Sequence, residues 1–245
     1  NYNITDQTST TANISAKALT ATASASNKVY DGSSAATSTL TLSGFVGSET
    51  VTSTNSSTFN NKNAGTGKTV TVNSITLADG SNGGLAANYS ISAGQTTTAN
   101  VTAKALTVSG ITASNKVYDS TTNATTVLSF SGLIGSETIN NTNSSTFDNK
   151  NIGTGKTVTV NSLTLVDGSN GGLASNYSIS SGQTTTANVS ARPLTVSNIS
   201  ASNKSYDGTT AVTLDTSNVS YNGLVSGDDF SGSFSGVFAN ENIGT

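Results

Sequence analysis

Acidic residues that could bind a metal recur in a short stretch that the chain contains three times. The stretch reads Asn27-Lys28-Val29-Tyr30-Asp31-Gly32, and its copies begin at Asn115 and Asn203, a step of 88 residues each time. Its aspartates, Asp31, Asp119 and Asp207, could each offer calcium an oxygen ligand. A calcium site takes about six to eight oxygens, and no second carboxylate lies within several residues of any of the three. We therefore expect each aspartate to cap a turn.

The tyrosine before each aspartate could serve as a flat platform for sugar rings. Aromatic residues make up only 6% of the chain, however, and each unit carries one such tyrosine. A large ring with a polar tip is more often used for packing. We therefore expect the tyrosines before the aspartates to belong to the core; they are Tyr30, Tyr118 and Tyr206. We expect the same of two further recurring tyrosines, Tyr89 and Tyr177.

Two glycine-rich segments imitate the end of a phosphate-binding loop. They read Gly65-Thr66-Gly67-Lys68-Thr69 and Gly153-Thr154-Gly155-Lys156-Thr157. Lysine stands where the motif needs its first glycine, and the residues that follow alternate like a strand, so nucleotide binding is not expected. The loops that begin at Asp79 and Asp167 have one acid each, which favours a β-turn over a metal loop.

The residue types needed for most catalysis are missing. The chain has no His and no Cys, which removes the commonest general base, the commonest metal ligand and thiolate chemistry. Paired acids could hydrolyse glycosides, but the acids here are sparse and mostly recur with the repeat. We expect no catalytic, cofactor-binding or metal-ligating residues and no enzyme activity. A Lys-to-Asn crosslink within each unit stays open, as does glycosylation at triplets such as Asn55-Ser56-Ser57.

Composition also excludes several partners. Charged residues are only 9% of the chain, and 10 basic against 13 acidic residues give a net charge of −3. Without a basic surface, nucleic acid and anionic membranes are not expected partners. No apolar run approaches the roughly 18 residues that a membrane span needs, so this chain is not expected to insert into a membrane.

The period divides the chain into small domains. Solenoid repeats run at about 20 to 50 residues, so a step of 88 predicts units that each fold around their own core. We interpret residues 1–15 as the closing segment of a preceding repeat, 16–102 and 103–190 as complete repeats, and 191–245 as a partial repeat. The partial repeat is expected to be ordered only if a neighbouring segment covers its strand edge.

Within a unit, apolar and hydroxyl residues alternate as in half-buried strands, and nothing repeats at the helical period. Strands are expected near residues 19–25, 36–42, 49–59, 68–77 and 89–101, the last one either continuous or broken in two. The class is all-β: tandem small β-domains, either β-sandwiches with Greek-key connections or a β-grasp-like arrangement. The short linker at 102–105 and Pro193 in the next one predict an elongated, stiff rod.

Four motifs in this order resemble a known family. They are Lys28-Val29-Tyr30-Asp31-Gly32, Gly44-Phe45-Val46-Gly47-Ser48-Glu49, the run from Phe59 to Val70, and Asn88-Tyr89. Together they resemble the YDG-type repeats, related to MBG-type repeats, of large bacterial surface and secreted adhesins. Ser120 departs from the glycine of the first motif in the second unit.

The resemblance implies an extracellular role on the bacterial cell surface or in a biofilm matrix. The units would form a structural stalk or spacer that projects a distal binding region. Host or bacterial receptors, or exopolysaccharide, would then be bound by other parts of the parent protein. The alternative is a module whose repeats each bind polysaccharide or a cell surface weakly and gain strength by repetition. The resemblance carries over no catalytic residue.

Overall fold

Nearly all regular structure in this chain is β-strand. The computed structural model describes residues 1–5 and 9–244. The first repeat contains β1 (Lys17–Ala18), β2 (Thr20–Ala25), β3 (Lys28–Val29), β4 (Ala35–Ala36), β5 (Ser38–Ser43), β6 (Val51–Phe59), β7 (Gly65–Asp79), β8 (Tyr89–Ser90) and β9 (Thr96–Thr102). The second contains β10 (Lys104–Ala105), β11 (Thr107–Ala113), β12 (Lys116–Val117), β13 (Asn123–Ala124), β14 (Thr126–Ser131), β15 (Ile139–Phe147), β16 (Gly153–Asp167), β17 (Tyr177–Ser178) and β18 (Thr184–Ser190). The third contains β19 (Thr195–Ser197), β20 (Ser200–Ala201), β21 (Leu214–Asp215) and β22 (Ser220–Asn222).

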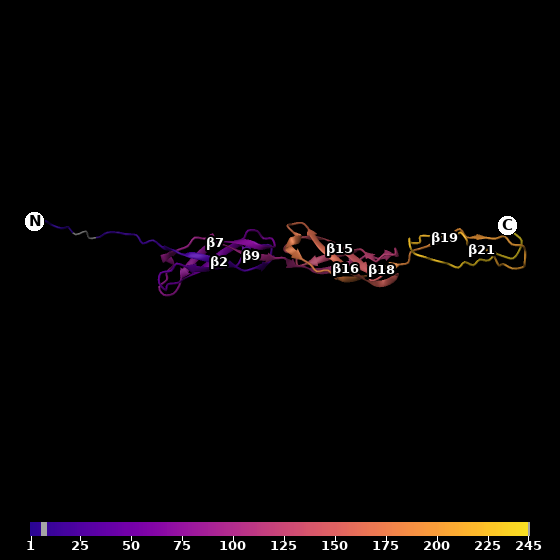
Figure 1. The fold of residues 1–245 in the computed structure, drawn as a ribbon, viewed down its shortest axis with the longest axis horizontal. Helices are drawn as coiled ribbons and strands as arrows, with labels where there is room; N and C mark the ends of the chain where they lie inside the picture. Colours follow the sequence, from indigo (N-terminus) through magenta and orange to yellow (C-terminus); the bar gives the residue numbers. More distant parts are fainter. Residues whose placement is uncertain (6–8, 245) are drawn as a thin grey trace. The chain divides into compact units, whose positions relative to one another are not determined.

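A five-stranded sheet forms the larger layer of the first repeat, in the order β3-β9-β7-β6-β4. Figure 1 labels two of its strands, β7 and β9. Its short edge strand β3 runs parallel to β9, and the other three pairings are antiparallel. The alternation seen in the sequence is realised directly, because Val70 and Val72 face inward and are fully buried while Thr69 and Thr71 are not. The second repeat has the equivalent sheet, β12-β18-β16-β15-β13.

A two-stranded ladder forms the second layer. In the first repeat β2 and β5 pair antiparallel over six residues, from Thr20 opposite Ser43 to Ala25 opposite Ser38. In the second repeat Ala113 of β11 packs against the core residues Phe147 and Val158 of the five-stranded sheet. Two packed β-layers therefore enclose each core, which confirms the all-β prediction. Among the described residues the helical segments are two 3₁₀ turns, η1 (Ala86–Asn88) and η2 (Ala174–Asn176).

The predicted strands agree with the structure in position, but some of them begin or end at other residues. The expected break between residues 89 and 101 is present, because β8 ends at Ser90 and β9 begins at Thr96. The two-residue strands β1, β3 and β4 were not predicted, since two residues carry no readable period. The glycine-rich segment that imitates a phosphate loop opens β7, as the strand interpretation required.

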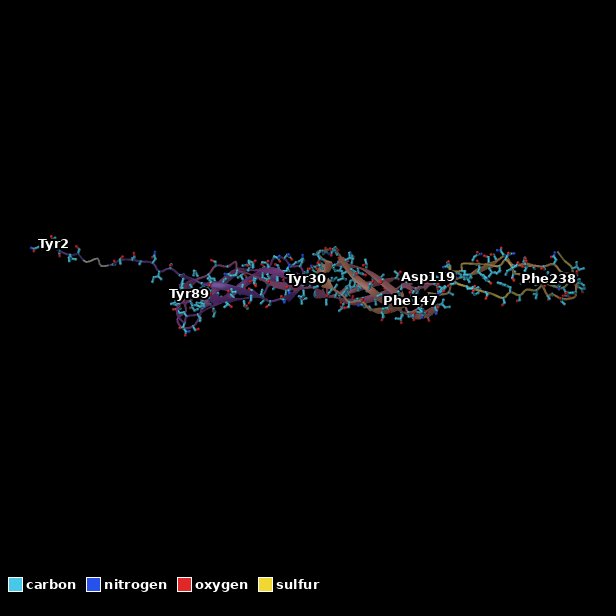
Figure 2. All side chains as sticks on the ribbon, viewed as in Figure 1. Tyr2, Tyr30, Tyr89, Asp119, Phe147 and Phe238 are labelled. Carbon is cyan, nitrogen blue, oxygen red and sulfur yellow. The ribbon has the colours of Figure 1, made fainter. Side chains whose placement is uncertain are left out.

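Each repeat has two ends with different residues. Tyr89 packs with Leu19 and Val51 in one apolar cluster, and Figure 2 shows Tyr89 and Tyr30 at opposite ends of the first repeat. We call the end that carries Tyr89 the head of a repeat and the end that carries Tyr30 its tail. In the second repeat the head consists of residues 131–141 and 165–179.

Candidate functional site

The first repeat forms one compact unit together with the head of the second repeat. This unit contains residues 1–107, 131–141 and 165–179, and the remainder of the chain forms the other unit. The grouping follows contacts rather than sequence order, since Thr107 and Ser131 are not neighbours in the chain. A site that couples the tail of one repeat to the head of the next therefore lies inside the first unit.

Glu137 is the centre of that site. The residue is only 7% exposed, yet its carboxylate has three donors. The Tyr30 hydroxyl donates to Oε1 at 2.6 Å, and Lys62 Nζ donates to the same oxygen at 3.0 Å. The Tyr177 hydroxyl donates to Oε2 at 2.6 Å. We call these four residues the Glu137 cluster; a buried carboxylate is tolerable here because both oxygens are hydrogen-bonded and a cation neutralises the charge.

The head of the second repeat holds two members of the cluster in place. The Glu137 amide donates to the Ile134 carbonyl at 3.0 Å, which closes the turn that presents the carboxylate. The Tyr177 hydroxyl accepts a hydrogen bond from the Ile134 amide at 3.0 Å while it donates to Glu137. Tyr177 itself is fixed by β17, which pairs parallel with β10.

The tail of the first repeat supplies the other two members. The Tyr30 amide donates to the Thr102 carbonyl at 2.8 Å, which extends the β3–β9 pairing by one residue and fixes the ring's direction. The Tyr30 and Tyr177 rings meet edge to face with centroids 5.5 Å apart. Lys62 Nζ lies 5.9 Å from the centre of the Tyr30 ring. The ring geometry adds attraction beyond burial alone.

Asn176 makes a second set of contacts beside the cluster. Its side chain is fully buried. Its Oδ1 accepts from the Ala64 amide at 2.8 Å, and its Nδ2 donates to Asn63 Oδ1 at 3.2 Å. Because both bonds cross from the second repeat to the first, they fix the register of head on tail.

Gly32 allows the close approach of the two surfaces. Its φ is +79°, and a Cβ placed there would lie 2.7 Å from Ile134 Cγ2. Glycine is therefore required for two independent reasons, the left-handed backbone and the space taken by Ile134. Gly32, the glycine of the Tyr-Asp-Gly sequence, is thus needed both for the turn and for the contact with the second repeat.

The electrostatics of the cluster favour an ionised Glu137 and neutral tyrosines. Burial acts to raise the pKa of Glu137, but hydrogen bonds from Tyr177, Tyr30 and Lys62 outweigh it and hold that pKa below its ordinary value. Burial and the hydrogen bond to Glu137 raise the pKa of Tyr177 to about 12 and also raise the pKa of Tyr30. The hydrogen bond to Glu137 raises the pKa of Lys62. A carboxylate with both oxygens engaged is suited to holding surfaces together rather than to proton transfer.

Equivalent positions elsewhere are less enclosed. In the first repeat Tyr89 donates to Glu49 Oε2 at 2.5 Å and accepts from the Val46 amide at 3.1 Å, but Glu49 is only half-buried. In the third repeat Asp228 takes the position of Glu137, since its amide also donates to the carbonyl three residues earlier. The second repeat meets Asp228 through Ser120, whose Oγ donates at 3.3 Å.

The tyrosines predicted to be core residues fall into two groups. Tyr30, Tyr89 and Tyr177 are buried, which confirms the prediction for them. Tyr118 is half-buried, and Tyr206 is 65% exposed, so the prediction is wrong for Tyr206. The physical reason is that Tyr30 owes its burial to Glu137 and Tyr177 of another repeat, and among the described residues no such pair covers Tyr206.

The aspartates of the repeated stretch cap turns, as predicted. Asp31 Oδ1 accepts from the Ser33 amide at 2.9 Å and from Lys28 Nζ at 2.8 Å. Lys28 also donates to the Ser33 and Ala35 carbonyls and lies 5.6 Å from the centre of the Phe59 ring. The same lysine bond lowers the pKa of Asp119 and of Asp207 to about 2 in the other two repeats. The repeated stretch therefore has a structural role, and in the first repeat all hydrogen-bond donors of its lysine, Lys28, have acceptors within the stretch and the strand that follows it.

The other predicted turns also agree with the structure. Asp79 Oδ1 and Asp167 Oδ1 each accept from a backbone amide seven residues later, at 2.7 Å, which closes the two loops. Ser120, which departs from the motif, keeps the left-handed backbone of its glycine counterpart with φ +66°.

The possible Lys-to-Asn crosslink has candidate partners in two places. Lys68 Nζ lies 2.5 Å from Asn61 Oδ1, and Lys156 Nζ lies 2.6 Å from Asn149 Oδ1. Lys156 Nζ also pairs with Asp148 at 2.8 Å, and this bond holds the pKa of Asp148 below its ordinary value. Both N···O distances are those of a hydrogen bond, and the crosslink stays a prediction that an intact mass of the chain would test.

Sequence reasoning missed the Glu137 cluster. A signal was present, because a glutamate ends the second motif in both complete repeats and a lysine recurs at positions 62 and 150. Neither residue had a partner nearby in sequence: Tyr30 and Glu137 are 107 residues apart. Only the contact between repeats brings them together.

The fold and the site together define a class of protein: tandem all-β repeats in which the tail of the first repeat hydrogen-bonds to the head of the second. The family model described as YDG domain matches residues 15–99, 102–187 and 190–245. The chain belongs to the YDG domain family. No curated protein and no solved structure matches it. Within the described residues no helix is long and apolar enough to span a membrane.

Proposed function

We propose that this chain is a structural spacer of an extracellular bacterial adhesin, on the cell surface or in a biofilm matrix. A spacer needs neighbouring repeats that do not swing freely, since otherwise its reach collapses. The observation that supports the proposal is the Glu137 cluster, in which charge, two tyrosine hydroxyls and a ring contact join one repeat to the next. The distal region that binds a receptor or exopolysaccharide belongs to other parts of the parent protein.

The composition supports the same role. Only 9% of the residues are charged, and hydroxyl and amide side chains hydrate the exposed strand faces instead. Because few charges are present, salt has little charge to screen. The short junction between β9 and β10 contains a single residue, Ala103, so little slack separates the first two repeats. Catalysis is not part of the proposal, because the buried carboxylate is ionised and has both oxygens engaged.

Small-angle scattering tests the spacer role. A compact globule of this length would have a maximum dimension of roughly 50 Å. The spacer predicts a value well above this, at least twice as large, and a globule-like value would contradict it. Titration with bacterial exopolysaccharides separates the spacer from a repeated binding module, because a spacer gives no saturable binding.

A further inference from the structure

The residue that follows the aspartate of the repeated stretch differs between the first two tails. It is Gly32 in the first repeat and Ser120 in the second, and both have a left-handed backbone, with φ +79° and +66°. Serine seldom adopts this conformation, because its Cβ is crowded there. Of the four non-glycine residues with positive φ in the described part of the chain, the other three are asparagines. The strain at Ser120 therefore calls for a compensating contact.

The Ser120 hydroxyl makes that contact at both of its sides. Its Oγ accepts from Lys150 Nζ at 3.2 Å and donates to Asp228 Oδ1 at 3.3 Å. The hydroxyl thus bridges the lysine of the second tail and the acid of the third repeat's head. In the contact between the first and second repeats, Lys62 Nζ instead donates directly to Glu137 Oε1 at 3.0 Å.

The two contacts divide similar groups differently between tail and head. Glutamate reaches a tail whose turn residue is glycine. Aspartate is one methylene shorter and meets a tail whose turn residue carries a hydroxymethyl group. The carbon that the acid lacks is thus supplied by the turn residue, together with a hydroxyl that donates to the carboxylate. In both arrangements the acid is linked to the lysine of the preceding repeat, directly or through one hydroxyl.

An exchange of these partners would leave a defect in either contact. A serine in place of Gly32 would bring its Cβ to 2.7 Å from Ile134 Cγ2, an atom one bond away from Ile134 Cβ and therefore not free to move aside. A glycine in place of Ser120 would remove the donor from the half-buried Asp228. An acceptor that loses its donor on burial costs free energy. Discrimination between partners needs such penalties for the wrong pairing as well as contacts for the right one.

We propose that the turn residue of a tail and the acid of a head form a matched pair that selects which repeat follows which. A tail with glycine selects a head with glutamate, and a tail with serine selects a head with aspartate. The partner that each tail recognises is thus a repeat of this family with the fitting acid. The proposal goes beyond the spacer function, because it concerns the order of the repeats and not their reach.

A double-mutant cycle on the first of the two contacts tests the pairing. The Ala64 amide donates to Asn176 Oδ1 across this contact, so its hydrogen exchange in the full chain reports how often head and tail separate. Gly32→Ser and Glu137→Asp should each raise the opening equilibrium constant about tenfold. In the combined variant this constant should be at least about fivefold below the product of the two single effects, because the serine hydroxyl donates to the shortened acid.

Gly32→Ala is the matched control for the hydroxyl. Alanine brings the same Cβ toward Ile134 and the same backbone strain, but it cannot donate to the acid. Gly32→Ala combined with Glu137→Asp should therefore give the product of the single effects. Equal behaviour of the serine and alanine variants beside Glu137→Asp would refute the matched pair. Scattering by the unaltered chain is unaffected by this result, so the spacer function stands or fails separately.

A second cycle on the other contact runs in the opposite direction. In the Ser120→Gly background, Asp228→Glu should lower the unfolding equilibrium constant in urea at least about threefold, because the longer acid reaches Lys150 as Glu137 reaches Lys62. In the unaltered tail, Asp228→Glu should bring no such gain. The same gain in both backgrounds, or none in either, would overturn the proposal.

Discussion

Glu49 and Glu137 occupy the same position in consecutive repeats, yet their surroundings differ. Both accept a hydrogen bond from the tyrosine of their own head, Tyr89 or Tyr177. Glu137 also faces the tail of another repeat, gains Tyr30 and Lys62, and becomes 7% exposed. Glu49 is half-buried, and among the described residues no tail faces it. Burial of this carboxylate is therefore a property of the contact and not of the repeat.

The two tails differ in the same way. Tyr30 faces a complete head and is 1% exposed. Tyr118 lines an open hollow together with Asp228, whose side chain is one methylene shorter than that of glutamate, and Tyr118 is half-buried. Ser120 and Lys150 compensate in part, since Lys150 Nζ donates to Ser120 Oγ at 3.2 Å and Ser120 Oγ donates to Asp228. The repeated stretch thus supplies a tail surface, and the strength of its contact depends on the residues of the head that it meets.

Removal of the central carboxylate should have the largest effect. Glu137→Ala leaves the Tyr30 and Tyr177 hydroxyls buried without their acceptor and Lys62 without its counter-ion. We expect a loss of about 3 kcal/mol in the free energy of unfolding of the first unit, measured in urea. Glu49→Ala is the matched control and should cost about 1 kcal/mol, because only one donor is lost there. Equal losses would contradict the comparison.

Alkaline pH should weaken the contact. The pKa of Tyr177 rises from its ordinary value of 10.0 to about 12 in the folded chain. A raised pKa stabilises the folded state fully below pH 10 and loses that contribution as pH rises toward 12. The loss corresponds to about 2 kcal/mol after allowance for solvent screening.

Unfolding in urea at pH 9, 10, 11 and 12 would measure this loss, with tyrosinate absorbance recorded in parallel. In Glu137→Gln the acceptor is neutral, so the decline should begin nearer pH 10. A decline identical in the two proteins would show that Glu137 does not set the pKa of Tyr177.

Exchange of the turn residues between the two tails should be asymmetric. Gly32→Ser places a Cβ 2.7 Å from Ile134 Cγ2 at φ +79°, and we expect a cost of about 1.5 kcal/mol. Ser120→Gly relieves the left-handed backbone at φ +66° but removes the bonds to Asp228 and Lys150. Its net effect should stay within about 0.5 kcal/mol. Thermal unfolding of both variants measures the difference, and costs of the same size would count against it.

The smallest loss expected within the Glu137 cluster comes from removal of a single hydroxyl. Tyr30→Phe keeps the ring contact with Tyr177 and removes one donor to Glu137, at a cost of about 1 kcal/mol. Tyr118→Phe is the control and should change stability by less than about 0.3 kcal/mol, because its ring is half-buried. A cost for Tyr118→Phe as large as that for Tyr30→Phe would remove the distinction between the two tails.

The sequence was enough to predict the long strands and the turns, which depend on local pattern. The alternation of Thr69-Val70-Thr71-Val72 predicted a half-buried strand, and Asp31 with Gly32 predicted a turn. The four motifs indicated the family. Each of these rests on residues that lie close together in the chain, where spacing alone fixes the geometry.

The Glu137 cluster could not be predicted because its members come from two repeats. Period-2 alternation says which face of a strand is buried but not which neighbour covers its end. Tyr206 shows the same limit, since the residue has the motif of Tyr30 and yet lies exposed. The parallel pairing of β3 with β9 was missed for a related reason: it joins residues 73 positions apart, Lys28 and Val101.

The distance between two repeats tests the central claim most directly. The chain has no cysteine, so Thr66→Cys in the first repeat and Val166→Cys in the head of the second give two unique spin-label sites at exposed positions within the first unit. With Glu137 in place, pulsed electron paramagnetic resonance should give one narrow distance distribution, because the Glu137 cluster holds head on tail. Glu137→Ala should broaden it. A distribution that is already broad with Glu137 present, or that Glu137→Ala leaves unchanged, would contradict the claim that this carboxylate joins consecutive repeats.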